Sequence, residues 1–105
     1  MSLMKKKIRQ EFKGSCLMRA NSKCEVCGFT PSDTKELDCH HIINREQIPN
    51  GGYVKENGII LCSYCHIQAE KFYETGVAES GYSVEDLFKI IKSSKELAVN
   101  KSKKL

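Results

Sequence analysis

The chain lacks the features that mark secreted or membrane-spanning proteins. It has no tryptophan in 105 residues, and it has no run of about 18 apolar residues that could form a transmembrane helix. Its basic N-terminal segment is not followed by the apolar stretch of a secretory signal. We find no internal repeat and no biased segment apart from a basic tail at residues 100–105. These absences favour a cytoplasmic protein that makes no membrane contact.

The length and composition limit the stability that a packed core can provide. A chain of 105 residues, of which 40% are hydrophobic, fits a single domain over residues 1–105. Ordering a domain of this size costs on the order of 100–200 kcal/mol of conformational entropy. An additional cross-link, such as a bound metal ion, would therefore be useful.

Basic side chains gather at the two ends of the chain, and the net charge is +4. Residues 1–23 contain seven basic groups and one acidic group, residues 95–105 contain four and one, and residues 24–94 contain six and eleven. Basic ends suit a polyanionic partner such as a nucleic acid, and Lys5, Lys6 and Lys7 are candidates for this contact. The alternative is that both ends are solvated tails.

Four of the six cysteines form two pairs with the spacing of metal ligands. Cys24 and Cys27 make one C-x-x-C pair, and Cys62 and Cys65 make another after 34 intervening residues. Two such pairs can complete a tetrahedral zinc site that leaves no open position on the ion, which predicts a structural zinc. Disulfides or a redox-active pair are alternatives. A reducing cytoplasm and the lack of a thioredoxin-like βαβ pattern argue against them.

Apolar spacing and turn residues divide the chain into short elements. Helices are predicted where apolar residues recur every three or four positions, and strands at short apolar runs. Ser83 and Asp86 resemble a capping box at the start of the last helix. The expected elements are a basic helix at 4–20, strands at 36–43 and 59–61, helices at 65–75 and 84–98, and a frayed end from residue 100. This pattern predicts a small α+β fold.

The three histidines of the chain lie near the cysteine pairs in sequence. His40 and His41 are neighbours on a predicted strand, so their side chains point to opposite faces and cannot both bind one ion. His66 directly follows the second cysteine pair, and Glu70 lies one helical turn further along. His66 and Glu70 can therefore chelate one cation together. The alternative interpretation is that the histidines are isolated polar residues or support the zinc site.

Three segments together resemble a known family. They are C-E-V-C-G, L-D-C-H-H-I-I-N-R and E-N-G-I-I-L-C-S-Y-C-H. Their order and spacing over residues 24–72 resemble the HNH endonucleases, and most of all the small members with two zinc knuckles, many of which are phage-encoded. The resemblance implies a ββα-metal (His-Me finger) core at about residues 24–74, with a helix added at each end.

The resemblance also implies a role for each matching residue. His40 and His66 match ligands of a catalytic divalent metal. His41 matches the general base that takes a proton from water, and its second ring nitrogen should be held by an acceptor. Asn57 matches a residue whose side-chain amide holds the loop and orients the base.

Two further positions concern the metal and the substrate. Glu70 stands where many relatives have histidine, and a carboxylate there would favour Mg²⁺ or Mn²⁺, with Ni²⁺ and Zn²⁺ as alternatives. Arg45 matches an arginine that would suit a phosphate contact. The implied function is a metal-dependent endonuclease that acts on double-stranded DNA in a bacterial or phage-infected cell. The alternatives are a non-catalytic zinc module that binds nucleic acid and a zinc-stapled adaptor for a protein partner.

Overall fold

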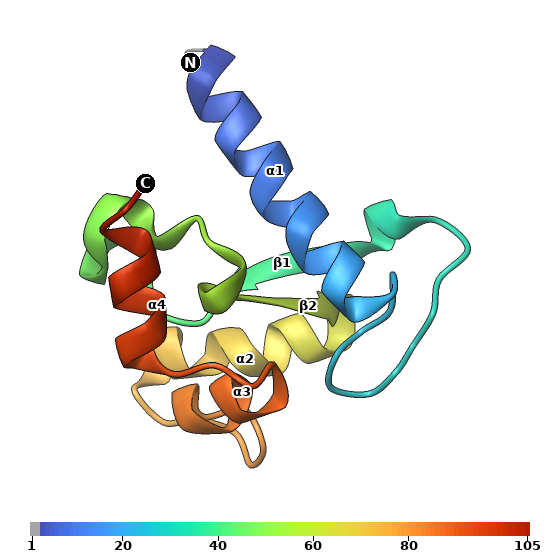
Figure 1. Cartoon of the computed structure of the whole chain (residues 1–105). Helices are drawn as coiled ribbons and strands as arrows, with labels where there is room; N and C mark the ends of the chain where they lie inside the picture. The colour runs from blue at the N-terminus through green and yellow to red at the C-terminus, as the bar shows by residue number, and fades with distance from the viewer. Residues whose placement is uncertain (1–2) are drawn as a thin grey trace.

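A two-stranded antiparallel sheet lies at the centre of the computed structural model, which describes residues 3–105 (Figure 1). Strand β1 spans Leu37–His41 and strand β2 spans Gly58–Cys62. Leu37 pairs with Cys62, and His41 pairs with Gly58. The adjacent histidines therefore lie at one end of the hairpin, and the second cysteine pair begins at the other end.

Helices cover both sides of this hairpin, so the fold is α+β as predicted. The α-helices within residues 3–105 are α1 (Leu3–Ala20), α2 (Ser63–Thr75), α3 (Val84–Ile90) and α4 (Lys95–Ser102). Short 3-10 turns lie before and between the strands: η1 (Thr34–Glu36), η2 (Arg45–Gln47), η3 (Pro49–Gly52) and η4 (Lys55–Asn57). In Figure 1, α1 lies on one side of the hairpin, and α2 and α3 lie on the other.

The core forms where α1 and α2 pack on β2, which is buried along its whole length. Phe12 and Cys16 enter it from α1, and Ala69 enters it from α2. Gly58 permits this close packing, because a Cβ atom there would lie 2.7 Å from both the Phe12 ring and the Cys16 sulfur. The hairpin is therefore fixed against both helices.

The first half of α1 projects away from the rest of the molecule (Figure 1). Residues 3–11 are all exposed. Four of them are Lys or Arg, and Glu11 forms an ion pair with Lys7 one helical turn away. Among residues 3–105, no helix is both long enough and apolar enough to do so.

Helix α2 begins directly after β2, and its end is set by Gly76. Gly76 has a φ of +78° and donates its backbone N–H to the carbonyl oxygen of Phe72 at 2.8 Å. Glycine adopts this left-handed conformation at low cost, so it ends the helix where the sequence predicts. Strands β1 and β2 and helix α2 thus follow one another along the chain and share one core.

The C-terminal region differs from the single helix predicted over residues 84–98. Ser83 and Asp86 form the expected capping box, but α3 ends at Ile90, and Lys92 has a φ of +57°. Ser93 then donates its hydroxyl to the carbonyl oxygen of Glu56 at 2.8 Å, and Ser94 caps α4. The prediction of one helix is wrong because these serine bonds compete with continued helix formation.

The end of the chain also differs from the predicted frayed tail, because part of it is helical. Helix α4 continues to Ser102, and both Ala98 and Ser102 are fully buried. Asn50, in the turn η3, donates its side-chain amide to the carbonyl oxygen of Ser102 at 2.9 Å. Helix α4 therefore supports the loop between the strands, which carries part of the site described below.

Candidate functional site

The two cysteine pairs come together at one end of the hairpin. The sulfur atoms of Cys24, Cys27, Cys62 and Cys65 all lie within 4.8 Å of one another, and all four cysteines are free thiols. The sulfur atoms of Cys27 and Cys62 are 3.7 Å apart. Four thiolates placed about 2.3 Å from a tetrahedral zinc would be about 3.8 Å from one another. The four cysteines are thus positioned for a zinc site and not for disulfides.

Backbone and side-chain contacts hold the first cysteine pair in this position. The Cys27 N–H points to the Cys24 sulfur at 3.5 Å. Burial would raise the pKa of Cys24, but backbone N–H groups, including that of Cys27, lower it to about 7. Glu25 accepts the backbone N–H of Ile60 at 2.9 Å and forms an ion pair with Arg19 at 2.6 Å. The first pair is thereby tied to both β2 and α1.

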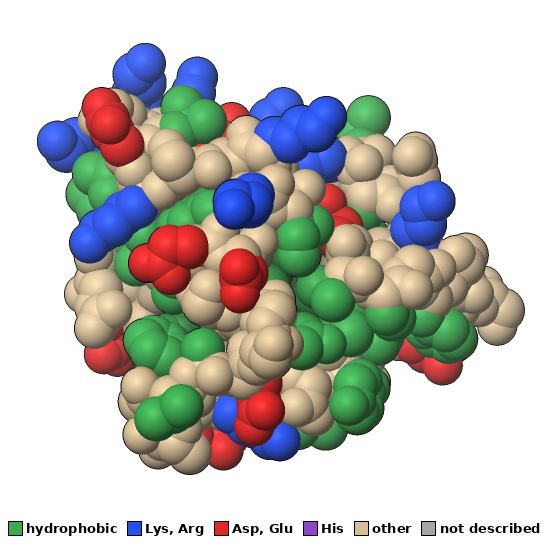
Figure 2. Space-filling view, turned by 90° about the horizontal axis from the view of Figure 1, so that it is seen from below, with side chains coloured by type: hydrophobic (Ala, Val, Ile, Leu, Met, Phe, Trp, Pro, Cys, Tyr) green, Lys and Arg blue, Asp and Glu red, His purple; other side chains and the backbone are tan. Residues whose placement is uncertain are grey.

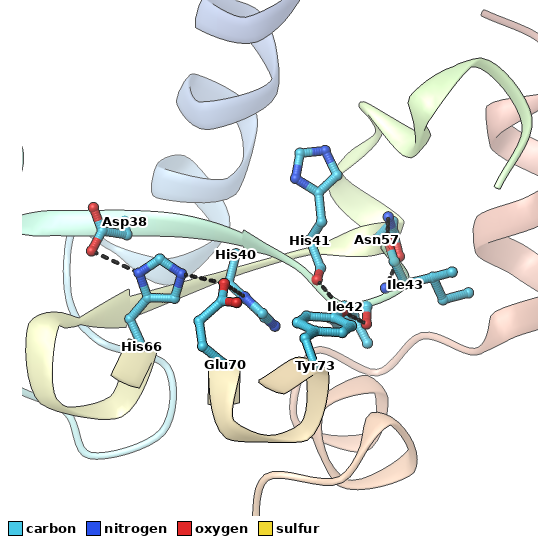
Figure 3. A network of polar contacts seen from close by, with 9 residues as sticks. All are labelled: Asp38, His40, His41, Ile42, Ile43, Asn57, His66, Glu70 and Tyr73. Carbon is cyan, nitrogen blue, oxygen red and sulfur yellow. Dashed lines mark hydrogen bonds and ion pairs between the residues drawn. The ribbon is translucent and has the colours of Figure 1, made fainter. Parts of the chain in front are cut away.

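A second cluster of possible metal ligands lies beside α2. His40, His66 and Glu70 offer ligand atoms that all lie within 4.8 Å of one another. A single oxygen of Glu70 is 3.0 Å from His66 Nε2 and 3.3 Å from His40 Nδ1. Figure 3 shows the three side chains converging between β1 and the first turns of α2. These residues could hold a metal ion.

The electrostatic setting of the two histidines suits metal binding. Burial, with smaller effects from charges at His66 and His41, lowers the pKa of His40 to about 3. His40 is therefore neutral near pH 7, with a lone pair available for a cation. Asp38 accepts a hydrogen bond from His66 Nδ1 at 3.0 Å. This bond directs the lone pair of His66 Nε2 toward the cluster.

Asp38 was not among the residues singled out by the sequence. It lies two positions before His40 on β1, and residues two apart on a strand share one face. This spacing is the signal that could have identified it. Its contact with His66 makes it a positioning residue for a ligand.

His41 lies on the opposite side of β1 from this cluster, as strand alternation predicts (Figure 3). Its ring centroid is 4.7 Å from that of Phe12 and 4.9 Å from that of Tyr53. Burial and the positive charge of Arg45 lower the pKa of His41 to about 4. The expected acceptor on its second nitrogen is not found, because the buried Nε2 atom has no hydrogen-bond partner among residues 3–105. Aromatic packing orients the ring instead.

Asn57 joins the ends of the loop that follows β1. It is fully buried, and its Oδ1 accepts the backbone N–H of Ile43 at 2.9 Å. Its Nδ2 donates to the carbonyl oxygens of Ile43 and Gly52 at 3.2 and 3.3 Å. Asn57 therefore holds the backbone two residues after His41 and acts on the ring only through that backbone.

Tyr73 is a second contact that the sequence did not suggest. Its hydroxyl donates to the backbone carbonyl oxygens of His41, at 2.9 Å, and Ile42 (Figure 3). Burial and the nearby Glu70 carboxylate raise the pKa of Tyr73 to about 12, so it remains a donor. Tyr73 lies three residues after Glu70 on α2, and this helical spacing could have placed it in the site.

An open pocket is lined by residues from both faces of the site. It measures about 270 Å³ and is lined by residues that include His40, His41, Arg45, His66 and Glu70. Of the three lysines predicted to contact nucleic acid, Lys5 lines a neighbouring groove together with Arg45. Lys6 and Lys7 are exposed on α1, and Lys7 lies 4.0 Å from Glu11. Of the three predicted lysines, Lys5 is thus the one that lines a groove next to the pocket.

An antiparallel hairpin followed by a helix, with possible metal ligands from the first strand and the helix, defines the ββα-metal class of fold. Residues 24–72 match the model of the HNH endonuclease family. The matched segment begins at the first cysteine of the zinc site and includes every residue of the histidine cluster. Searches of curated proteins and of solved structures find no match.

Proposed function

We propose that the protein is a metal-dependent endonuclease that hydrolyses phosphodiester bonds in double-stranded DNA. His41 is the general base in this proposal. His40, His66 and Glu70 hold one catalytic divalent cation, and the four cysteines hold a separate structural zinc. The match of residues 24–72 to the HNH family supports action on a nucleic acid.

One observation carries the proposal: a neutral histidine and a cluster of metal ligands share one pocket. His41 and the atoms of His40, His66 and Glu70 approach this pocket from opposite sides of β1. Hydrolysis of a phosphodiester needs a proton acceptor for water and charge stabilisation at the departing oxygen. The two sides of the pocket offer these two functions separately.

The reaction requires a water oxygen to bond to phosphorus while the bond from phosphorus to the 3′ oxygen breaks. His41 takes the proton that the water loses. Nε2 of His41 is buried, so Nδ1 is the nitrogen that receives this proton. A bound phosphate brings negative charge near the imidazole and raises its pKa toward the range in which a base is effective. Arg45, at the rim of the pocket, offers its guanidinium to a phosphate group of the substrate.

The ligand set indicates the kind of cation. A divalent ion there would polarise the scissile phosphate and stabilise the negative charge on the departing oxygen. The carboxylate of Glu70 favours Mg²⁺ or Mn²⁺ over softer ions, with Ni²⁺ and Zn²⁺ as alternatives. Two imidazoles and one carboxylate leave further positions on such an ion for phosphate oxygen and water.

Cleavage of supercoiled plasmid DNA with Mg²⁺, Mn²⁺, Ni²⁺ or Zn²⁺ tests the proposal. We expect nicked or linear product with the wild-type chain, and a rate at least about 100-fold lower for His41→Ala, which is the lower range for a lost general base. Glu74→Gln, an exposed change on α2, serves as the control and should cleave normally.

Undiminished cleavage by purified His41→Ala would rule out the assignment of the base. DNA binding that depends on salt, without cleavage by the wild-type chain in any of the metals, would favour the non-catalytic zinc module. Zinc content and the thermal unfolding curve of each variant should match the wild-type values, so that a lost activity reports on chemistry.

A further inference from the structure

A groove of about 660 Å³ lies between the projecting half of α1 and the loop that carries η2 and η3. Its charged lining residues are Lys5, Arg9 and Arg45, with Glu46 as the acidic member. Lys5 and Arg9 are one helical turn apart, so both can face this groove from α1. Arg45 also lines the pocket of the histidine cluster. The groove and that pocket are therefore neighbours, and Arg45 belongs to both.

Two guanidinium groups lie near the hydroxyl of Tyr53. Arg45 Nη1 donates to this oxygen at 2.9 Å. Burial would raise the pKa of Tyr53, but the nearby Arg45 and Arg9 side chains lower it. Arg9 comes from α1 and Arg45 comes from η2, so the fold brings two cations that lie far apart in the sequence to one tyrosine. A guanidinium has five N–H donors, and the contact with Tyr53 uses one of those of Arg45.

Tyr53 also contacts the candidate base. Its ring lies edge-on to the His41 ring, with centroids 4.9 Å apart and an interplanar angle of 89°. A group bound by the two arginines would therefore lie next to the site of hydrolysis. The same tyrosine therefore contacts both the Arg45 guanidinium and the His41 imidazole.

The charge of this groove distinguishes it from other surfaces of the molecule. A second groove of about 630 Å³ along α1 is lined by Arg19 and Lys55 but also by Glu11 and Glu56, so its charges balance. The face seen in Figure 2, on the side of α3, carries acidic, basic and apolar side chains together. The excess of cations next to the pocket favours an anionic ligand on the α1 side.

We propose that Arg9 and Arg45, which line one groove beside Tyr53, form a binding subsite for a phosphate that flanks the scissile phosphate of a nucleic-acid strand, and that Lys5 extends it by one helical turn. The proposal deepens the proposed function, because it assigns contacts to a neighbouring phosphate of the same substrate. Arginine suits this position because its planar fork matches two phosphate oxygens at once.

Binding of a fluorescein-labelled 20-base-pair duplex can be measured by anisotropy at several KCl concentrations, without chelator. The full-length chain with His41→Ala prevents cleavage during the measurement. We compare Arg9→Gln and Tyr53→Phe in this background with Lys89→Gln, which removes one positive charge from the exposed end of α3. Arg9→Gln should reduce the slope of log K against log salt by about 0.9, the value for one phosphate contact.

Arg9→Gln should also weaken binding by about tenfold at 0.1 M salt, which is the loss expected for one charge-assisted contact. Tyr53→Phe keeps the aromatic ring and removes the hydroxyl that accepts from Arg45, so it should weaken binding by a smaller factor in the same direction. Lys89→Gln should leave both the slope and the affinity unchanged. Equal behaviour of Arg9→Gln and Lys89→Gln would overturn the subsite.

Cleavage separates this inference from the proposed function. In the active chain, Arg9→Gln should raise KM while leaving kcat within about twofold, because it removes binding shared by ground and transition states. If the wild-type chain cleaves DNA but Arg9→Gln leaves KM unchanged, the subsite is wrong and the endonuclease assignment stands. If no metal supports cleavage while the salt slope still depends on Arg9, the subsite stands alone.

Discussion

The molecule contains two clusters of possible metal ligands that differ in kind. One consists of four cysteines, of which Cys24, Cys62 and Cys65 are buried. The other consists of His40, His66 and Glu70 and lines an open pocket. Four thiolates fill the coordination sphere of a zinc ion, whereas two imidazoles and a carboxylate leave positions for substrate. We therefore assign stability to the first cluster and chemistry to the second.

The same short elements build both clusters. Cys65 and His66 are neighbours on α2, and β1 runs from Leu37, opposite Cys62, to His41. The two ends of β1 are about 13 Å apart at 3.3 Å per residue. A zinc at the cysteine end would fix where α2 begins and thus where His66 lies. Small displacements at one cluster would then reach the other through a rigid hairpin.

Loss of the four-cysteine site should have the largest effect on the molecule. A structural zinc contributes about 10–16 kcal/mol of apparent folding free energy, comparable to the 5–15 kcal/mol of a typical domain. We expect Cys62→Ala, or removal of zinc by a strong chelator, to abolish the cooperative thermal unfolding transition seen by circular dichroism. Elemental analysis should give one tightly held zinc per wild-type chain. An intact transition after complete loss of zinc would contradict the structural assignment.

Loss of a ligand from the second cluster should lower activity and leave the stability of the fold nearly unchanged. His66→Ala should keep the zinc and change the free energy of unfolding by about 1 kcal/mol or less, since the side chain is partly exposed. Its rate of plasmid cleavage should fall by roughly 1000-fold, because metal catalysis supplies several kcal/mol. Zinc loss or unfolding in His66→Ala would remove the distinction between the two clusters.

Much of this architecture could be predicted from local patterns in the sequence. The C-x-x-C spacing indicated the four-cysteine site, and the apolar run at residues 59–61 indicated the second strand. Strand alternation placed His40 and His41 on opposite faces. Each of these features depends on residues a few positions apart, where backbone geometry alone decides what side chains can do.

The features that were missed depend on contacts between distant segments. The break between α3 and α4 is stabilised by Ser93 at the backbone of Glu56, and helical spacing of apolar residues continues across it. Tyr53 lies in a loop without periodicity, so only the fold reveals that it bonds Arg45 and lines one groove with Arg9. Local spacing could not distinguish such contacts from ordinary surface residues.

Replacement of Asp38 tests how His66 is oriented in the second cluster, and we expect it to have the smallest effect on activity. Its hydrogen bond to His66 Nδ1 fixes which nitrogen of His66 faces the cluster. Loss of a carboxylate behind a metal-bound histidine typically lowers metal affinity 10–100-fold. Asp38→Ala should therefore raise the Mn²⁺ concentration for half-maximal cleavage by that factor, with little change in rate at saturating Mn²⁺, and Glu74→Gln should change neither. An unchanged Mn²⁺ dependence would mean that packing alone orients His66.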